Sequence, residues 1–218
     1  MKIPFYKKAI SYFFPFKLKE VNSVKNNLLR VYLFRNQMML SCADAIYSQG
    51  TSYEPFRLPF KKIKKEISSL NSFLLLGTGL GSALQILQED YHHYPESTLV
   101  DIDEEVLALS KEWMNLNVKN NVEWICEDAL LFLKESTNKY DLIGVDVFKG
   151  TCVPYDIQTE YFINLCAERL SPNGIVIFNF ISQNKTDALL LEGNMKHKFK
   201  NIDTIQHFLN TFYVCKNH

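Results

Sequence analysis

The sequence lacks the cysteine pattern of a disulfide-rich secreted protein or a zinc protein. Its five cysteines are odd in number and scattered along 218 residues, and they form no CxxC pair and have no histidine cluster beside them. They are Cys42, Cys126, Cys152, Cys166 and Cys215. We therefore expect buried free thiols, no disulfide framework, no metal site and a reducing, cytoplasmic location.

The sequence also lacks an apolar run long enough to cross a membrane. The longest uncharged run near the N-terminus, residues 9–16, is interrupted by Pro15, and no small-residue cleavage site follows it. We expect a soluble protein with no signal peptide and no membrane partner. With 47% hydrophobic and 22% charged residues, the chain is long enough for one hydrophobic core and a small accessory unit.

A net charge is also missing, but the two signs are unevenly distributed. Residues 1–70 carry 13 Lys/Arg and 4 Asp/Glu, and residues 71–218 carry the remaining 11 and 20. The asymmetry predicts two units, an N-terminal arm with a β-hairpin over residues 1–52 and a larger domain over residues 53–218. The N-terminal unit is a candidate homodimer contact, and no nucleic-acid partner is expected.

Hydrophobic periodicity predicts an α/β fold. Residues 28–34 and 38–43 have the pattern of a hairpin, and residues 53–69 that of a helix. Strands at 73–76, 97–102, 122–126, 141–146 and 174–180 then alternate with helices at 82–91, 104–116, 128–136 and 157–170, before a helix near 185–197 and strands at 203–208 and 211–215. Continuous apolar strands indicate burial on both faces. We predict a Rossmann-like, doubly wound, seven-stranded, mostly parallel sheet with a terminal antiparallel strand, preceded by a small β-hairpin unit.

Three glycines interrupt the apolar stretch "FLLLGTGLGSALQIL", between a predicted strand and a predicted helix. Glycines there permit close backbone approach, and the N-terminus of the helix supplies partial positive charge, which favours a nucleotide site. The dinucleotide pattern G-x-G-x-x-G is not met, because Gly77, Gly79 and Gly81 are evenly spaced. Alone, the loop leaves a choice between a tight turn and a ligand site.

Acidic residues follow the next two strands. Asp101 lies 20 residues past Gly81, where a carboxylate can accept both hydroxyls of a ribose. Glu127 and Asp128 follow the next strand, where a carboxylate can accept a hydrogen bond from an adenine amino group. The alternative role of these acids is helix capping, for which Asp103 is also suited. Three such loops at the carboxyl ends of consecutive strands together predict an adenosine site.

The fourth loop, in "YDLIGVDVFKG", places Asp146 at the end of a strand. In this fold the position faces the reacting end of a ligand, so Asp146 is a candidate for orienting a substrate or stabilising charge. A structural acid is the alternative. Tyr155 and Asp156, just beyond, are candidates for lining or covering the same pocket.

Four segments, "LLLGTGLGSALQIL", "LVDIDEEVLALS", "VEWICEDALLFL" and "YDLIGVDVFKG" with the residues up to Phe180, resemble the class I S-adenosylmethionine-dependent methyltransferase fold, and most closely its spermidine synthase-like branch. The resemblance covers about residues 25–181. It implies binding of S-adenosylmethionine or its decarboxylated form, with loop 77–81 against the methionyl part, Asp101 on the ribose and Asp128 at the adenine. The implied donor-binding residues are Gly77, Thr78, Gly79, Gly81, Asp101, Ile102, Glu127, Asp128, Ala129 and Asp146, and the candidate catalytic residues are Asp146 and Tyr53.

Two departures from that branch bear on the substrate. Leu80 stands where polyamine aminopropyltransferases carry an Asp in their glycine loop, and Lys149 stands where they carry the second Asp of a D-S-x-D pattern. A lysine there repels a polycationic acceptor. The leading hypothesis is therefore an S-adenosylmethionine-dependent methyltransferase acting on a small molecule. The alternatives are an aminopropyltransferase with an altered acceptor site and a nucleoside-binding protein without catalysis.

Overall fold

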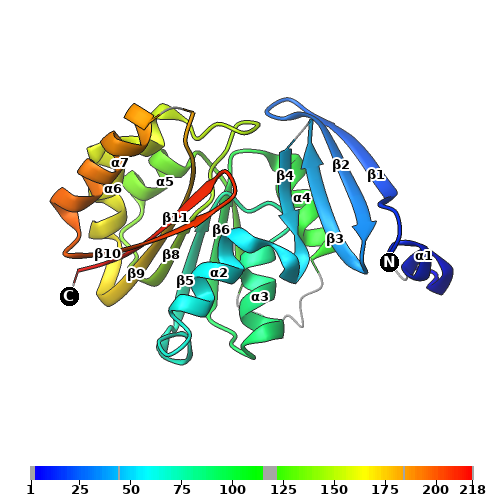
Figure 1. Ribbon diagram of the computed structural model, residues 1–218, viewed down its shortest axis with the longest axis horizontal. Coiled ribbons are helices and arrows are strands. Elements are labelled where there is room, and N and C mark those ends of the chain that lie inside the picture. The colour runs from blue at the N-terminus through cyan, green and yellow to red at the C-terminus, as the bar shows by residue number, and fades with distance from the viewer. Residues whose placement is uncertain (1–2, 44, 115–121, 184, 218) are drawn as a thin grey trace.

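The computed structural model describes residues 3–43, 45–114, 122–183 and 185–217, and these form two sheets (Figure 1). The N-terminal sheet has four antiparallel strands in the order β1-β2-β3-β4. The main sheet has seven strands in the order β10-β11-β9-β8-β5-β6-β7. The predicted Rossmann-like α/β fold is confirmed, and the N-terminal unit is larger than the predicted hairpin. The predicted boundary between residues 52 and 53 stays a prediction.

The N-terminal sheet contains the predicted hairpin and two further strands. The elements are α1 Phe5–Ile10, β1 Phe16–Ser23, β2 Asn27–Phe34, β3 Gln37–Cys42 and β4 Ala45–Gln49. Arg35 and Asn36 form the two-residue turn between β2 and β3, and both have positive φ, which matches the twist of a hairpin without a glycine. The sequence prediction missed β1, whose apolar face is only half-buried: Leu18 and Val21 pack against the cluster between the two sheets, and Ser23 is its only buried residue.

The main sheet is built from alternating strands and helices. The elements are α2 Glu54–Lys62, β5 Ser72–Leu76, α3 Ser82–Asp90, β6 Glu96–Asp101, α4 Glu104–Trp113, β7 Val122–Cys126, α5 Ala129–Glu135, β8 Tyr140–Val145, α6 Glu160–Glu168, β9 Leu170–Ile181, α7 Lys185–Lys198, β10 Asn201–His207 and β11 Asn210–Lys216. Strands β5 to β9 pair in parallel, and β11 is antiparallel to both β9 and β10. The strand order reverses between β5 and β8, where a doubly wound sheet opens a crevice.

Two predicted helices have different bounds in the structure. The helix predicted over residues 53–69 ends at Lys62, and a separate 3-10 turn follows at Ile67–Ser69. The helix predicted over 157–170 begins only at Glu160, since the Thr159 side chain caps it, and Leu170 already belongs to β9. The last two residues of the helix predicted over 104–116 lie outside the described residues.

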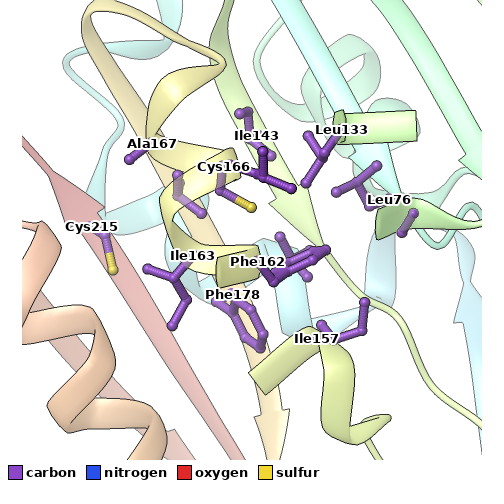
Figure 2. Packing of buried hydrophobic residues seen from close by; sticks show 14 of the residues in the cluster. Leu76, Leu133, Ile143, Ile157, Phe162, Ile163, Cys166, Ala167, Phe178 and Cys215 are labelled. Atoms are coloured by element: carbon purple, nitrogen blue, oxygen red, sulfur yellow. The ribbon is translucent and has the colours of Figure 1, made fainter. Parts of the chain in front are cut away.

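Side chains of the main sheet alternate between two hydrophobic clusters. In β5, Leu74 and Leu76 join the cluster that α5, α6 and α7 cover, whereas Phe73 and Leu75 join the cluster under α2 and α3. Figure 2 shows the first cluster, in which Phe162 of α6 and Phe178 of β9 meet edge to face with ring centroids 6.4 Å apart. This two-sided burial explains the continuous apolar strands in the sequence.

A third cluster joins the N-terminal sheet to the main sheet. It contains Leu29, Val31, Leu40 and Cys42 of the N-terminal sheet, Val106, Leu109 and Trp113 of α4, and Leu80 of the glycine loop. Leu80 is 1% exposed. Asp103 reinforces the junction, because its carboxylate caps α4 and also accepts hydrogen bonds from the Ser23 hydroxyl and the Asn26 amide.

The N-terminal arm, residues 3–15, exposes several large apolar side chains, among them Phe5, Phe13 and Phe14. The predicted homodimer contact through this unit stays a prediction. Among the described residues, no helix is long and apolar enough to span a membrane.

Candidate functional site

A cavity of about 820 Å³ opens at the point where the strand order reverses. The loops after β5, β6, β7 and β8 line one side of it. Other parts of the wall come from β4, the start of α2, the end of β9, and the turns between β1 and β2 and between β10 and β11. The cavity is therefore enclosed by both sheets, and its size is that of a pocket for a drug-sized ligand.

The glycines of the loop after β5 are in close contact with other parts of the protein as well as with the cavity. Gly77 has a φ of +83°, and a Cβ there would lie 2.2 Å from the backbone oxygen of Asp146. Gly81 has a φ of +73°, and a Cβ there would lie 2.0 Å from the Met114 sulfur. Positive φ and close contacts both require glycine at these positions. Gly77 and Gly79 line the cavity, whereas Thr78, Leu80 and Gly81 are not among its lining residues.

Asp101, at the end of β6, lies in the cavity wall next to the glycine loop. Its Oδ2 accepts the backbone N–H of Thr78 at 2.9 Å, and its Oδ1 accepts that of Asp103 at 3.0 Å. Burial raises the pKa of Asp101 to about 6, and the backbone N–H groups partly offset that effect. The carboxylate is thus fixed in orientation and still faces the cavity.

Asp128 lines the cavity and also caps the next helix. Its Oδ1 accepts the backbone N–H groups of Leu130 and Leu131, at 2.9 and 3.1 Å. Asp128 therefore caps α5, which was the alternative role for it. Because it also lines the cavity, its contact with an adenine stays a prediction. Ile102, Glu127 and Ala129 also line the cavity, as the sequence predicts for a donor-binding surface.

Asp146 is held by two neutral hydrogen-bond donors. The hydroxyl of Tyr53, just before α2, donates to Oδ2 at 2.9 Å, and the Nδ2 of Asn179, in β9, donates to Oδ1 at 2.7 Å. Burial raises the pKa of Asp146 to about 6, against the lowering effect of these two bonds. Burial and the adjacent carboxylate also raise the pKa of Tyr53, which keeps its hydroxyl a donor.

Two asparagines of the cavity wall were not among the predicted site residues, and the wall also contains Tyr47. Asn179 and Asn210 extend the contacts of Asp146, because the Asn210 Nδ2 donates to the Asn179 Oδ1 at 2.8 Å. The Tyr47 hydroxyl donates to the Asn26 Oδ1 at 3.1 Å and accepts the backbone N–H of Gly150 at 2.9 Å. The one signal in the sequence is that an asparagine is unusual inside an apolar strand such as "GIVIFNF".

Charge around the cavity is predominantly negative. Among the described lining residues, six are carboxylates and two are lysines. The carboxylates are Glu54, Asp101, Glu127, Asp128, Asp146 and Asp156, and the lysines are Lys25 and Lys149. Tyr155 is 73% exposed and is not among the lining residues. The described residues contain no group of three His, Cys, Asp or Glu side chains that could hold a metal ion.

Comparison with known proteins identifies the family. The sequence profile of the "Spermine/spermidine synthase domain" matches residues 64–215, which is more than half of the chain. The chain belongs to the spermine/spermidine synthase family. The predicted resemblance is therefore confirmed.

Relatives within and beyond this family fit the same fold. A "Polyamine aminopropyltransferase" of Vibrio vulnificus is 30% identical over 117 residues, covering 51% of this chain and 38% of that protein. An "N-terminal histidine N-methyltransferase" of Emericella nidulans is 30% identical over 144 residues, covering 63% and 25%. The crystal structure of a probable spermidine synthase from Corynebacterium glutamicum superposes with a TM-score of 0.78 at 18% identity, covering 93% of this chain and 80% of that one. The matched segments cover between 24% and 53% of the length of the first three curated relatives.

Proposed function

We propose that the chain is a transferase that moves an aminopropyl group from decarboxylated S-adenosylmethionine to an amine held in the cavity. The observation that carries this proposal is the charge of the wall, six carboxylates against two lysines. Decarboxylated S-adenosylmethionine has a sulfonium and an ammonium and no carboxylate, so a negative cavity favours it over S-adenosylmethionine. Membership of the spermine/spermidine synthase family supports the same donor. This choice replaces methyl transfer as the leading hypothesis from the sequence.

The lining residues fit such a donor. A carboxylate has about four acceptor sites, and three backbone N–H groups contact Asp101, so this carboxylate can still accept a ribose hydroxyl. Glu127 and Asp128 flank the position proposed for the adenine amino group. Gly77, Gly79 and Asp146 all line the cavity, which is where we place the sulfonium end of the donor.

Asp146 is proposed to accept the proton of the attacking amine. The donor supplies an electrophilic carbon bonded to its sulfonium sulfur: the acceptor nitrogen bonds to that carbon, the carbon–sulfur bond breaks, and its electron pair leaves with the thioether. With a pKa of about 6, Asp146 is a stronger base than an ordinary aspartate and is still mostly ionised at neutral pH. The Tyr53 hydroxyl fixes the carboxylate relative to the acceptor, and such positioning supplies much of the rate.

The acceptor is proposed to differ from a linear polyamine. Lys149 lines the cavity three residues after Asp146, and its charge opposes a second ammonium group on the acceptor. Leu80 does not contact the acceptor, because its side chain is buried in the cluster between the two sheets and does not line the cavity. The proposed acceptor therefore offers one amine to Asp146 and no second cation beside Lys149.

Methyl transfer from S-adenosylmethionine is the second candidate. Lys149 favours it, because a cation in the wall can pair with a carboxylate of the donor or the acceptor. The N-methyltransferase among the relatives is in line with it. The proton-accepting role of Asp146 would be the same.

Isothermal titration calorimetry with four nucleosides tests the proposal. These are S-adenosylmethionine, S-adenosylhomocysteine, decarboxylated S-adenosylmethionine and methylthioadenosine. We expect the decarboxylated donor and methylthioadenosine to bind more tightly, and mass spectrometry to detect methylthioadenosine release with an amine panel. Preference for the carboxylated pair, with release of S-adenosylhomocysteine, would establish methyl transfer instead. Binding without turnover would favour a nucleoside-binding protein, and no binding to any of the four would reject the site.

A further inference from the structure

The side chains around Asp146 form a hydrogen-bonded series that ends on the last hairpin. The Asn210 Nδ2 donates to the Asn179 Oδ1 at 2.8 Å, and the Asn179 Nδ2 donates to the Asp146 Oδ1 at 2.7 Å. The two asparagines lie on neighbouring antiparallel strands, β11 and β9. Asn179 is 2% exposed, so little solvent competes for its amide.

We propose that Asn210 is a positioning residue that fixes which end of the Asn179 amide faces Asp146. An asparagine amide has a donor end and an acceptor end of nearly equal size, and a half-turn exchanges them. The reversed orientation would place the Asn179 oxygen against the Asp146 carboxylate, two acceptors facing each other. The structure shows Asn210 with its N–H toward Asn179, and in that orientation it stabilises the productive orientation by bonding the Asn179 oxygen.

The turn between β10 and β11 also contacts the residue next to Tyr53, the second hydrogen-bond donor to Asp146. The His207 Nε2 lies 2.5 Å from the Glu54 Oε2, and Glu54 directly follows Tyr53, whose hydroxyl bonds the other carboxylate oxygen. Phe208 of the same turn is 94% exposed and lines the cavity. The two ends of this turn thus carry Asn210, which contacts the Asn179 amide, and His207, which contacts the residue next to Tyr53.

The ionisation of Asp146 reports on this arrangement. Burial and the charge of Asp101, at the end of β6, both raise the pKa of Asp146, whereas the bonds from Asn179 and Tyr53 lower it. The other charged or titratable groups in this part of the cavity wall are Glu54, Lys149 and His207. Loss of the Asn179 N–H would therefore raise the pKa of Asp146 further.

Carboxyl-carbon NMR of the full chain, labelled with ¹³C at aspartate, measures this pKa directly. Asp146→Asn assigns the signal by its disappearance. In Asn210→Asp the new carboxylate can only accept, so Asn179 turns its N–H toward it, and we expect the pKa of Asp146 to rise by about one pH unit. Asn210→Ala removes the fixed donor without adding charge, and we expect a smaller rise. Gln206→Ala, on the exposed part of the same hairpin, is the matched control and should leave the pKa unchanged.

Repeating Asn210→Asp in an Asn179→Ala background separates an effect that passes through the Asn179 amide from direct charge repulsion between residue 210 and Asp146. We expect most of the rise to disappear there. A rise of the same size without Asn179, or no rise in Asn210→Asp and Asn210→Ala with Asn179 present, would overturn the proposal.

The catalytic consequence rests on the proposed function. We expect the acid limb of the kcat/KM profile to follow the NMR pKa in each variant, while donor affinity changes little. Because the NMR measurement needs no turnover, an inactive protein with the expected rise would reject the proposed function and keep the role of Asn210.

Discussion

Replacing the proposed base should make the protein more stable at neutral pH. Asp146→Asn keeps the shape of the side chain and removes a charge that burial disfavours. The new amide oxygen can accept the N–H of Asn179, and the new amide nitrogen can donate to the Tyr53 hydroxyl, which turns to accept it. Both contacts of residue 146 are kept, and the freed proton of Tyr53, which lines the cavity, can bond to water there, so we expect the main effect on stability to be electrostatic.

The magnitude follows from the pKa in the folded state. Burial raises the pKa of Asp146 from 3.8 to about 6, so the folded protein binds this proton more tightly than the unfolded chain. Keeping the group ionised in the folded state costs about 3 kcal/mol well above pH 6, since each unit of pKa corresponds to about 1.4 kcal/mol. The cost decreases as the pH falls through 6 and is absent below about 3.8, where the group is neutral in both states. Asp146→Asn should gain up to that amount at pH 7.5 and almost nothing near pH 4.

Urea denaturation of both proteins at pH 7.5, 6.5, 5.5 and 4.5 measures the difference, and the slope with denaturant checks that the transition stays comparable. Asp156→Asn removes an exposed carboxylate from the same cavity wall and should change stability by less than about 0.5 kcal/mol at every pH. An Asp146→Asn protein that is less stable at pH 7.5, or whose gain does not decrease toward acid pH, would refute the assignment of a raised pKa to Asp146.

Four further predictions test separate parts of the site. Asp101→Ala should weaken nucleoside binding by about 10- to 100-fold in calorimetry, because a charged acceptor is lost, and unchanged affinity would reject the ribose contact. Lys149→Asp should raise kcat/KM for diamine acceptors by about tenfold or more in a product assay, and no gain would show that Lys149 does not set acceptor choice. Leu80→Asp should destabilise the fold by about 3 kcal/mol or more in urea, whereas the exposed Leu189→Asp should change it by less than about 0.5 kcal/mol. Phe13→Ser with Phe14→Ser should convert a homodimer to monomer in sedimentation, and identical sedimentation of both proteins would exclude this contact.

The main sheet could be predicted because each of its strands carries its own signal. Phe73 to Leu76 are buried on both faces, so the apolar run is visible without tertiary information. The acids after β6, β7 and β8 could be predicted for the same reason, since each directly follows such a run. Only two of the four strands of the N-terminal sheet were predicted, because the faces of β1 and β4 are only partly buried, with Leu18, Val21 and Tyr47 at the edge of the cluster between the sheets.

What the sequence could not supply is the direction in which a side chain points. From the sequence alone, Leu80 looks like the replacement of a carboxylate in the donor site. In the structure its side chain is 1% exposed and lies in the cluster that joins the two sheets. Asn179 and Asn210 are 31 residues apart and show no shared motif, and only the pairing of β9 with β11 brings their amides to 2.8 Å. A residue at a position that carries charge in related enzymes can therefore serve the junction between the sheets, while residues without any motif orient the carboxylate. We therefore expect substrate choice in this chain to depend on the surroundings of Asp146, and on Lys149 above all, more than on the glycine loop.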